Sequence, residues 1–389
     1  MARILLVDDE MNILQVLSCM LRSKKHEVVF TTEGQKAIEH TKAEHFDLLI
    51  SDIRMSPVDG MTVLKNVRAV RPELPVLMLT AYGSLDTAKQ AIDLGAFGYL
   101  LKPFNLQELL ITVERALTYK TQRKGAAAEE AKSTTEYDLE DIVGESTATK
   151  ELRDAIRRIA PQETSVLICG ERGTGKSLVA KAIHGLGSRK KNKFVSINCA
   201  TLPEPLLELE LFGYVKGAFP SATSGKAGIF ESAAHGTVLF DEIGWMPRNL
   251  QRKVHEAVSS MGIRRMGGHE NIPIDVRVIA TAITPAAKLV EQGNVIEDVY
   301  SMLRSGVIEI KDLQNRKEDI IPLVKHILLK ECGKDRQYTI STEAEQILIS
   351  CVWPENVRDL EGAIKYAVKT SLGNQITRDN LPKDLSVSA

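Results

Sequence analysis

Short apolar runs alternate with amphipathic stretches through the first 120 residues of the chain. Runs rich in β-branched residues and leucine predict strands at Ile4–Val7, Glu27–Thr31, Leu48–Ser51, Val76–Leu79 and Tyr99–Leu101. Apolar positions at helical spacing separate them, and a last amphipathic helix is expected at Leu106–Tyr119. Five β/α units in succession predict an α/β fold, a flavodoxin-like doubly wound parallel sheet with its site at the carboxyl ends of the strands.

The pattern changes after residue 120. Residues 121–137 are polar and alanine-rich and lack apolar anchors, which is typical of a linker. A second α/β pattern occupies 138–312, and a helical segment occupies 313–389. A chain of 389 residues is long enough for two or three domains that each bury a core. We therefore predict a first domain at 1–120, a linker, a second α/β domain and a helical subdomain.

Composition narrows the setting. Fifty Lys and Arg against 51 Asp and Glu give a net charge of −1, so any basic surface must be local. The five cysteines show neither C-x-x-C nor metal-ligand spacing, which indicates reduced thiols. No signal peptide precedes the first predicted strand, and no apolar run reaches membrane-spanning length. We expect a cytoplasmic protein with no membrane partner.

Acidic residues stand at the carboxyl ends of two predicted strands. Asp8 and Asp9 follow the first strand, and Asp52 ends the third. These strand ends are neighbours in a doubly wound sheet, so the three carboxylates should converge on one crevice. Like charges that close together require a cation, and hard oxygen ligands suit Mg²⁺.

Two more polar residues end the remaining strands of this sheet. Thr80 ends the fourth strand, and Lys102, before Pro103, ends the fifth. A hydroxyl and an ammonium that face a carboxylate–metal site could bind an incoming phosphoryl group. Each residue alone would more often be an ordinary polar loop residue, but five at matching strand ends predict a phosphoryl site.

A glycine-rich loop of the form G-x-x-x-x-G-K-S begins the chemistry of the second domain. Its residues are Gly170, Glu171, Arg172, Gly173, Thr174, Gly175, Lys176 and Ser177. An apolar run precedes it and a helical pattern follows, which is the context of a P-loop. Backbone N–H groups and the helix N-terminus then cradle phosphates, Lys176 reaches the β- and γ-phosphates, and Ser177 can ligate Mg²⁺.

The apolar run Thr237–Phe240 ends in Asp241 and Glu242. Asp241, at the end of a buried strand, would hold the metal ion, and Glu242 would polarise the attacking water. Together with the P-loop, this pair predicts a nucleotide site.

The first 120 residues resemble the receiver domain of two-component response regulators. The resemblance is carried by Val-Asp-Asp-Glu at 7–10, Ile-Ser-Asp at 50–52, Leu-Thr-Ala at 79–81 and Lys-Pro-Phe at 102–104. It implies a histidine kinase as partner and Asp52 as phosphoacceptor. It also implies Mg²⁺ ligands at Asp8, Asp9, Asp52 and the Arg54 carbonyl, with Thr80 and Lys102 on the phosphoryl group. Tyr99 matches the aromatic switch position, although a strand tyrosine is equally an ordinary packing residue.

The chain from Ile142 to about Leu385 resembles the AAA+ domain of sigma-54-dependent transcription activators, the NtrC family. Besides the P-loop, the matching segments are Ile142-Val-Gly-Glu-Ser, Phe194-Val-Ser-Ile-Asn-Cys-Ala, Glu210-Leu-Phe-Gly-Tyr-Val-Lys-Gly-Ala-Phe, Gly236-Thr-Val-Leu-Phe-Asp-Glu-Ile-Gly and Trp353-Pro-Glu-Asn-Val-Arg-Asp-Leu-Glu. The resemblance implies a P-loop α/β subdomain with a small α-helical lid that binds ATP or ADP with Mg²⁺.

The same resemblance assigns further residues to the nucleotide site. Asn198 falls where the family's asparagine pairs with the catalytic glutamate, here Glu242, beside Asp241. Arg358 falls at the sensor II position, and Val143 lies in the segment that contacts the nucleotide. Without the resemblance, Arg358 would be interpreted as a solvated helix charge.

Three family motifs are changed. The polymerase-remodelling loop Gly-Ala-Phe-Thr-Gly-Ala reads Gly217-Ala-Phe-Pro-Ser-Ala222, and its proline stiffens a loop that must move. Ile283 stands at the sensor I asparagine. Ile296 and Met302 stand where the family has two arginine fingers, and Arg304 comes two residues late, on another helix face.

These changes predict a site that binds nucleotide but hydrolyses it poorly. An arginine finger contributes roughly 10³–10⁵ in turnover, whereas binding depends on the intact P-loop and metal ligands. In addition, the residues after the lid helix hold no helix-turn-helix, so we expect no direct DNA-binding domain in these 389 residues.

Our leading hypothesis is a phosphorylation-controlled regulator with a weakly hydrolysing AAA+ module. It would act through protein contacts with sigma-54 RNA polymerase, an active AAA+ paralogue or itself. The alternative is an ordinary ATP-hydrolysing activator whose finger comes from Arg304, Arg316 or a partner. A third interpretation, an empty scaffold, conflicts with the complete set of nucleotide ligands. The stripe at Leu106, Leu109, Leu110, Val113 and Leu117 is interpreted either as core or as a dimer seam.

Overall fold

The computed structural model describes residues 2–80, 87, 90–91, 94–102, 109–110, 112–113, 116–117, 139–200, 202, 204–219, 222, 224–332, 338–371, 373–382 and 385. The expected linker at 121–137 lies outside these residues, as does much of the helix expected at 106–119. The chain forms two compact units. One comprises Met1–Thr135, Ala200–Gly228 and Arg264–Glu270, and the other comprises Glu136–Cys199, Ile229–Ile263 and Asn271–Ala389.

The receiver-like part of the first unit is built on a five-stranded parallel sheet. Its strands are β1 (Arg3–Val7), β2 (Glu27–Thr31), β3 (Leu48–Asp52), β4 (Val76–Thr80) and β5 (Gly98–Leu101), in the order β2-β1-β3-β4-β5. All neighbouring pairs are parallel, with Val7 opposite Ser51 and Asp52 opposite Leu79. The carboxyl ends of β1, β3, β4 and β5 therefore follow one another along one edge. This confirms the predicted doubly wound α/β fold.

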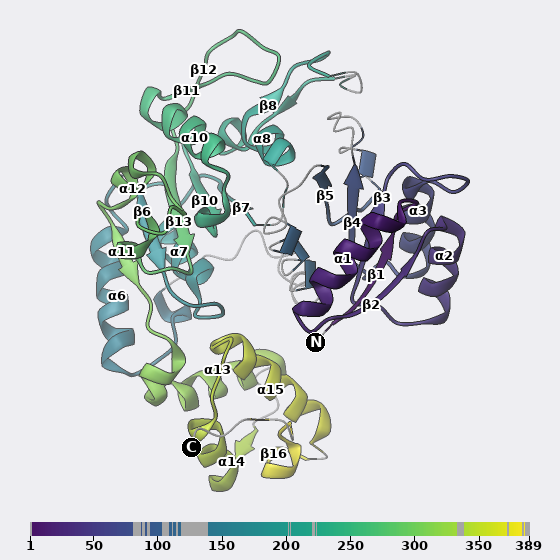
Figure 1. Cartoon of the computed structure of the whole chain (residues 1–389). Coiled ribbons are helices and arrows are strands. Elements are labelled where there is room, and N and C mark those ends of the chain that lie inside the picture. The colour runs from purple at the N-terminus through teal and green to yellow at the C-terminus, as the bar shows by residue number, and fades with distance from the viewer. Residues whose placement is uncertain are drawn as a thin grey trace. The chain divides into compact units, whose positions relative to one another are not determined.

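Alternation along the strands divides the core of this sheet between its two faces. Leu5 and Val7 pack with α2 (Gly34–Ala43) and α3 (Gly60–Val70), which lie side by side in Figure 1. Ile4 and Leu6 pack on the other face with α1 (Met11–Ser23). The described part of the apolar stripe joins this second core, with Leu109 and Val113 buried. Those two positions are core residues, and Leu106 lies outside the described residues.

The second unit contains another five-stranded parallel sheet. It consists of β14 (Val307–Glu309), β6 (Val166–Cys169), β13 (Arg277–Ala282), β10 (Thr237–Asp241) and β7 (Phe194–Asn198), in that order. Helices α6 (Thr147–Ile159) and α7 (Lys176–Gly185) pack against its apolar side chains. The P-loop strand β6 is thus a neighbour of β13, and the strand that ends in Asp241 lies on the other side of β13 (Figure 1).

Shorter elements connect these strands. They are η1 (Leu139–Asp141), α8 (Glu204–Phe212), β8 (Gly213–Tyr214), β9 (Lys226–Ala227), α9 (Ile229–Ser232), η2 (Ile243–Trp245), α10 (Arg248–Ser260), β11 (Gly262–Ile263), β12 (Ile272–Pro273), α11 (Ala286–Leu289) and α12 (Glu297–Leu303).

The helical subdomain begins with η3 (Leu313–Asp319). It continues with α13 (Ile320–Cys332), β15 (Thr339–Ile340), α14 (Thr342–Ser350), α15 (Val357–Thr370), β16 (Gln375–Ile376) and η4 (Arg378–Asn380). These helices enclose a core of their own that includes Leu313, Trp353 and Leu360. The expected core position of Trp353 is confirmed, since it is 3% exposed and its indole N–H donates to the Leu348 carbonyl. No helix within the described ranges is both long and apolar enough to span a membrane.

Candidate nucleotide and phosphoryl sites

The receiver site is organised by a lysine shared between two carboxylates. Lys102 Nζ lies 2.6 Å from Asp8 Oδ2 and 2.8 Å from Asp52 Oδ1. The remaining oxygens accept backbone N–H groups: Asp8 Oδ1 from Glu10 and Asp52 Oδ2 from Arg54. Both carboxylates are buried, Asp8 at 1% and Asp52 at 6% exposure. Asp8, Asp52 and Lys102 come from three strand ends and meet at one point. The sequence predicted that the two carboxylates would lie close together.

Burial controls the electrostatics of this cluster. Burial raises the pKa of Asp52 above its ordinary value, although the hydrogen bond and charge of Lys102 act against it. Burial also lowers the pKa of Lys102, but its bonds to Asp52 and Asp8 outweigh that effect and raise it. The difference arises because Lys102 has two anionic partners, while Asp52 shares one cation with Asp8. The single ammonium group of Lys102 balances only part of the negative charge of Asp8 and Asp52. A divalent cation therefore fits beside Asp52.

The other predicted receiver residues are placed as follows. Thr80 is buried at the end of β4, one strand from Asp52. Asp9 and Arg54 are exposed. Within the described residues, no three His, Cys, Asp or Glu side chains gather closely enough to hold a metal ion. The candidate ligands are therefore the buried carboxylates of Asp8 and Asp52 and the Arg54 carbonyl. The role of Asp9 as a third carboxylate ligand stays a prediction.

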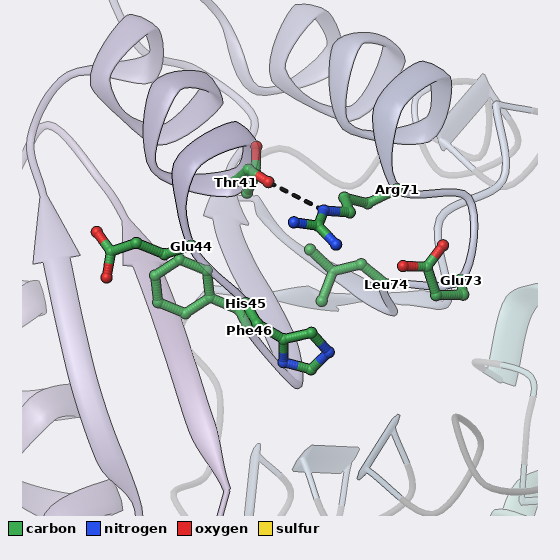
Figure 2. A pocket seen from close by; sticks show the side chains of 7 residues that line it. All are labelled: Thr41, Glu44, His45, Phe46, Arg71, Glu73 and Leu74. Carbon is green, nitrogen blue, oxygen red and sulfur yellow. Dashed lines mark hydrogen bonds between the residues drawn. The ribbon is translucent and has the colours of Figure 1, made fainter.

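A small hollow lies elsewhere in the receiver-like part (Figure 2). It is lined by Thr41, Glu44, His45, Phe46, Arg71, Glu73 and Leu74. Arg71 Nε donates to the Thr41 carbonyl across it. Its volume is about 10 Å³, roughly the space of one water molecule. It therefore offers no room for a ligand.

The P-loop has the predicted context of strand, glycine-rich turn and helix. Gly173 and Gly175 adopt φ values of 72° and 103°, a region that side chains with a Cβ rarely enter. A Cβ on Gly173 would also lie 1.8 Å from the Glu355 carbonyl oxygen. Helix α7 begins at Lys176 directly after this turn, so its free N–H groups lie at the loop. The arrangement fits a phosphate group.

Lys176 is folded against its own loop. Its Nζ donates to the carbonyl oxygens of Gly170 and Glu171, at 2.8 and 2.9 Å, and the residue is 8% exposed. Burial lowers its pKa, against the opposing charges of Asp241 and Glu242. A buried ammonium that donates to two neutral carbonyls fits an anionic ligand. Ser177, by contrast, is exposed on the first turn of α7.

The end of β10 presents the two acidic residues that the sequence predicted. Asp241 Oδ1 accepts a 2.5 Å hydrogen bond from the Thr281 hydroxyl, and the same hydroxyl accepts the Glu242 backbone N–H at 2.8 Å. Glu242 adopts a left-handed conformation, with φ at 57°. The Asn198 amide nitrogen lies 3.5 Å from Asp241 Oδ2. The pairing of Asn198 with Glu242 stays a prediction.

Thr281 is a site residue that sequence reasoning placed only within the altered sensor I stretch. It is fully buried on β13 and bridges Asp241 and Glu242. No local signal identifies it, because the apolar pattern of a strand shows which side chains are buried and not which distant residues they meet.

The remaining predicted positions surround the loop. Arg358 lies on α15 with half of its side chain exposed, 3.4 Å from Glu355. Val143 is half-buried against the core of the helical subdomain. At the altered positions, Ile283, Ile296 and Met302 are all half-buried. Arg358 lies beside the P-loop, since a Cβ on Gly173 would lie 3.2 Å from the Arg358 Cβ. Contact of Arg358 or Val143 with a nucleotide remains a prediction.

The two alternative finger arginines differ in exposure. Arg304 is exposed at the end of α12. Arg316 is 6% exposed and donates from Nη2 to the Thr174 carbonyl of its own P-loop, at 3.1 Å. Of these two, only Arg304 lies where a neighbouring subunit could meet it.

The changed polymerase-type loop is described in part. Phe219 is buried and its ring lies 4.9 Å from that of Tyr214. Pro220 and Ser221, which carry the substitution, lie outside the described residues. The stiffness expected from Pro220 therefore stays a prediction.

Three regions of the chain match known protein families. Residues 4–114 match the response regulator receiver domain, 142–310 the sigma-54 interaction domain and 314–389 the AAA+ ATPase lid domain. With the sheets and sites above, these matches define the class: a two-component response regulator with a sigma-54 activator domain.

Individual relatives agree over nearly the whole chain. It is 36% identical over 381 residues to the transcriptional regulatory protein ZraR of Klebsiella oxytoca, covering 97% of this chain and 85% of the relative. It is 37% identical over 385 residues to the regulatory protein AtoC of Escherichia coli K12, covering 98% and 84%. A crystal structure of NtrX from Brucella abortus matches with a TM-score of 0.56 and 30% identity, covering 99% and 87%. The chain belongs to the NtrC family of response regulators.

Proposed function

We propose that this response regulator accepts a phosphoryl group on Asp52, binds ATP or ADP with Mg²⁺ in its AAA+ domain, and hydrolyses ATP slowly or not at all. The observation that carries the proposal is the contrast between two parts of the nucleotide site. The P-loop, Lys176 and the Asp241–Glu242 pair are complete. The sensor I position and the two arginine-finger positions, which the family uses for hydrolysis, hold apolar side chains.

Nucleotide binding is supported by the P-loop geometry. Left-handed glycines, a helix beginning at Lys176 and a buried ammonium form a cradle for an anion. Asp241 and Ser177 are the side chains that would hold Mg²⁺, which supplies charge neutralisation on the phosphates when bound. Among the relatives, NtrX from Brucella abortus has been solved in complex with ADP and with ATP, at 30% and 29% identity.

Weak hydrolysis is supported by the side chains at the finger and sensor positions. Ile296 and Met302 have no charge with which to stabilise a transition state, and Ile283 has no polar group for the γ-phosphate. The loss of an arginine finger lowers turnover by roughly 10³–10⁵. Thr281 and Asn198 still hold Asp241, so binding and turnover are expected to separate.

An ordinary ATP-hydrolysing activator remains the second candidate because Arg304 is exposed at the end of α12. Arg316 is a poor choice for that role, since its guanidinium is buried against the P-loop of its own chain. In this second case Arg304, or a partner's arginine, would supply the finger, and Arg304→Ala would remove most of the turnover.

The receiver supports a regulatory input. Asp52 is buried beside Lys102, and burial raises its pKa, so a bound metal ion would favour its charged form. A histidine kinase would be the phosphoryl donor. The output would pass through protein contacts, with sigma-54 RNA polymerase, an active AAA+ paralogue or a second copy of the chain as candidate partners in the cytoplasm.

The test uses one preparation of the full chain. Titration calorimetry gives the affinities for ADP and ATP with Mg²⁺, and phosphate release gives the steady-state turnover, each with and without a small acyl-phosphate donor. We expect measurable binding with turnover lower than that of an ordinary family member by a factor of about 10³ or more. Ordinary turnover would refute weak hydrolysis, and the absence of binding to either nucleotide would refute the nucleotide site itself.

A further inference from the structure

Three consecutive carbonyl groups of the P-loop each accept a hydrogen bond from the hinge or the helical subdomain. The Arg172 carbonyl accepts from Asn356 Nδ2 at 2.9 Å. The Gly173 carbonyl accepts from the Val357 backbone N–H at 3.1 Å. The Thr174 carbonyl accepts from Arg316 Nη2 at 3.1 Å. The face of the loop that carries these carbonyls is therefore closed by residues more than 140 positions away in the sequence.

The opposite face of the same peptides carries the phosphate-binding groups. In a trans peptide the C=O and N–H point in opposite directions, so a donor on the Arg172 carbonyl orients the N–H of Gly173. The same holds for the next two peptides. A hydrogen bond on a carbonyl also polarises the peptide and strengthens its N–H as a donor. The three contacts thus fix and strengthen the N–H groups that form an anion nest.

Asn356 is the central residue of this arrangement. It is 1% exposed, and its Oδ1 accepts the Leu313 backbone N–H at 2.6 Å. Its Nδ2 donates to Arg172 and, at 3.3 Å, to Glu171 Oε2. The Asn356 side chain therefore connects the hinge, the P-loop and the start of α15. Among short side chains, only an amide could form this set of hydrogen bonds.

The backbone of Asn356 is strained. Its φ of 53° and ψ of −128° belong to a region that residues with a Cβ avoid. Such strain persists only where the surrounding structure enforces it, and it is concentrated at functional sites. Glycine would adopt this conformation without strain. The presence of asparagine instead points to a need for its amide group.

We propose that Asn356, with Val357 and Arg316, sets the phosphate-facing shape of the P-loop, so that the lid position and nucleotide affinity depend on each other. Asn356 is a positioning residue, because it touches the loop rather than the nucleotide. This inference rests on nucleotide binding as proposed above and adds the element that controls it. By linkage, bound nucleotide stabilises the docking of α15 on the loop to the same degree that docking favours the nucleotide.

Two substitutions separate positioning from folding. Asn356→Asp keeps the oxygen that accepts from Leu313 but places a carboxylate against the Arg172 carbonyl and Glu171. Asn356→Gly removes the amide and relieves the backbone strain. We expect both to weaken ADP binding by at least about tenfold, the effect of losing buried hydrogen bonds. We expect Asn356→Gly to retain more of the wild-type Tm than Asn356→Asp does. A merely structural residue would change Tm and affinity together.

A rescue variant and a control complete the experiment. Asn356→Asp combined with Glu171→Gln restores an amide–carboxylate pair with the partners exchanged, and it should recover part of the ADP affinity that Asn356→Asp loses. Asn380→Asp makes the same chemical change in η4, where the Asn380 oxygen accepts from Thr377, and should leave ADP affinity unchanged. Affinities are measured by calorimetry with Mg²⁺ and ADP on the full chain.

The outcomes distinguish this inference from nucleotide binding itself. If the wild type binds ADP and both Asn356 variants bind it within twofold, the inference is wrong and the proposed function stands. If the wild type binds no nucleotide, the proposed function is wrong. The inference is then judged by amide exchange: faster exchange of the Val357 N–H in Asn356→Asp supports it, and unchanged exchange refutes it.

Discussion

At the scale of single residues, buried polar side chains connect segments of this protein that lie far apart in the sequence. Thr281 reaches Asp241 over 40 positions in the sequence, and Asp319 reaches Thr149 over 170. Hydrophobic periodicity does not reveal such residues, because it reports which face of a local element is apolar and not what that face meets. The strand-end residues Asp52 and Lys102 could be predicted, since a parallel sheet brings its strand ends together whatever the distant contacts are.

Thr281 gives the first prediction at this scale. Thr281→Val removes the hydroxyl that Asp241 and the Glu242 N–H share, so both groups lose this hydrogen bond. We expect a loss of about 1–3 kcal/mol in the free energy of unfolding. We also expect Mg²⁺ to contribute less to ADP affinity, because Asp241 loses its fixed orientation. Urea denaturation and ADP titrations with Mg²⁺ or EDTA measure both effects.

Two further variants control that experiment. Thr281→Ser keeps the hydroxyl and should behave like the wild type, while Thr284→Val makes the same chemical change three residues further on. Wild-type stability together with a wild-type Mg²⁺ effect in Thr281→Val would contradict the assigned role.

Asp319 gives a prediction about pH. Its carboxylate accepts from the Glu145 and Ser146 backbone N–H groups and from the Ser146 and Thr149 hydroxyls. Burial alone would raise its pKa, but these hydrogen bonds outweigh burial and lower it below the ordinary value of 3.8. A lowered pKa in the folded state means that the stabilisation is present above the unfolded-state pKa and is lost as pH falls through the folded-state pKa.

The test compares unfolding free energies between pH 2 and 7. We expect Asp319→Asn to cost about 3 kcal/mol at pH 7, the effect of breaking a buried charged network. The difference from the wild type should begin to shrink below about pH 4, where the carboxylate of the unfolded chain becomes protonated, and should disappear only once the pH falls through the lower pKa of the folded state. Asp312→Asn, at an N-cap of the same segment, serves as the matched control. A difference that does not change with pH would show that Asp319 stabilises the fold without its charge.

At the scale of elements, the receiver strands were predicted closely from the sequence. Each receiver strand differs from its prediction by one residue or none. Helix α15 begins at Val357, directly after Asn356, whose side chain bonds to the P-loop. Tertiary hydrogen bonds set that boundary, and local sequence cannot show them.

Restoring arginine at the two finger positions of the α12 region tests whether their loss limits hydrolysis. Ile296→Arg and Met302→Arg together place charges at the two positions where the family resemblance has arginine fingers. We expect steady-state turnover to rise by at least about tenfold, a small part of the roughly 10³–10⁵ of a full finger. The Kd for ADP should stay within about twofold. Phosphate release and calorimetry on the same samples measure the two quantities.

A matched pair of lysine substitutions controls for charge alone. Ile296→Lys with Met302→Lys adds the same charge without the planar fork of arginine, and should restore less. Unchanged turnover in the arginine variant, with assembly intact, would mean that the missing fingers do not limit hydrolysis.

At the scale of the whole molecule, the receiver and the AAA+ domain carry separate chemistries on similar parallel sheets. The receiver prediction concerns Asp52. Asp52→Asn should abolish phosphoryl uptake from an acyl-phosphate donor, because the amide cannot act as the acceptor nucleophile. Mass spectrometry of the intact protein detects the added phosphoryl group. Asp59→Asn, at the exposed N-cap of α3, is the matched control. Uptake by Asp52→Asn at the wild-type level would mean that another residue is the acceptor.

The fate of one bound ATP shows whether the AAA+ site holds nucleotide without hydrolysing it efficiently. ATP labelled on the γ-phosphate is bound to excess full-length protein with Mg²⁺, and the ratio of ATP to ADP is followed in time. An ordinary enzyme with a turnover of about 1 s⁻¹ or more converts its ATP within seconds. Without fingers, we predict that bound ATP persists for about ten minutes or longer. Conversion of the bound ATP within seconds would show that the site hydrolyses ATP efficiently without the two arginines.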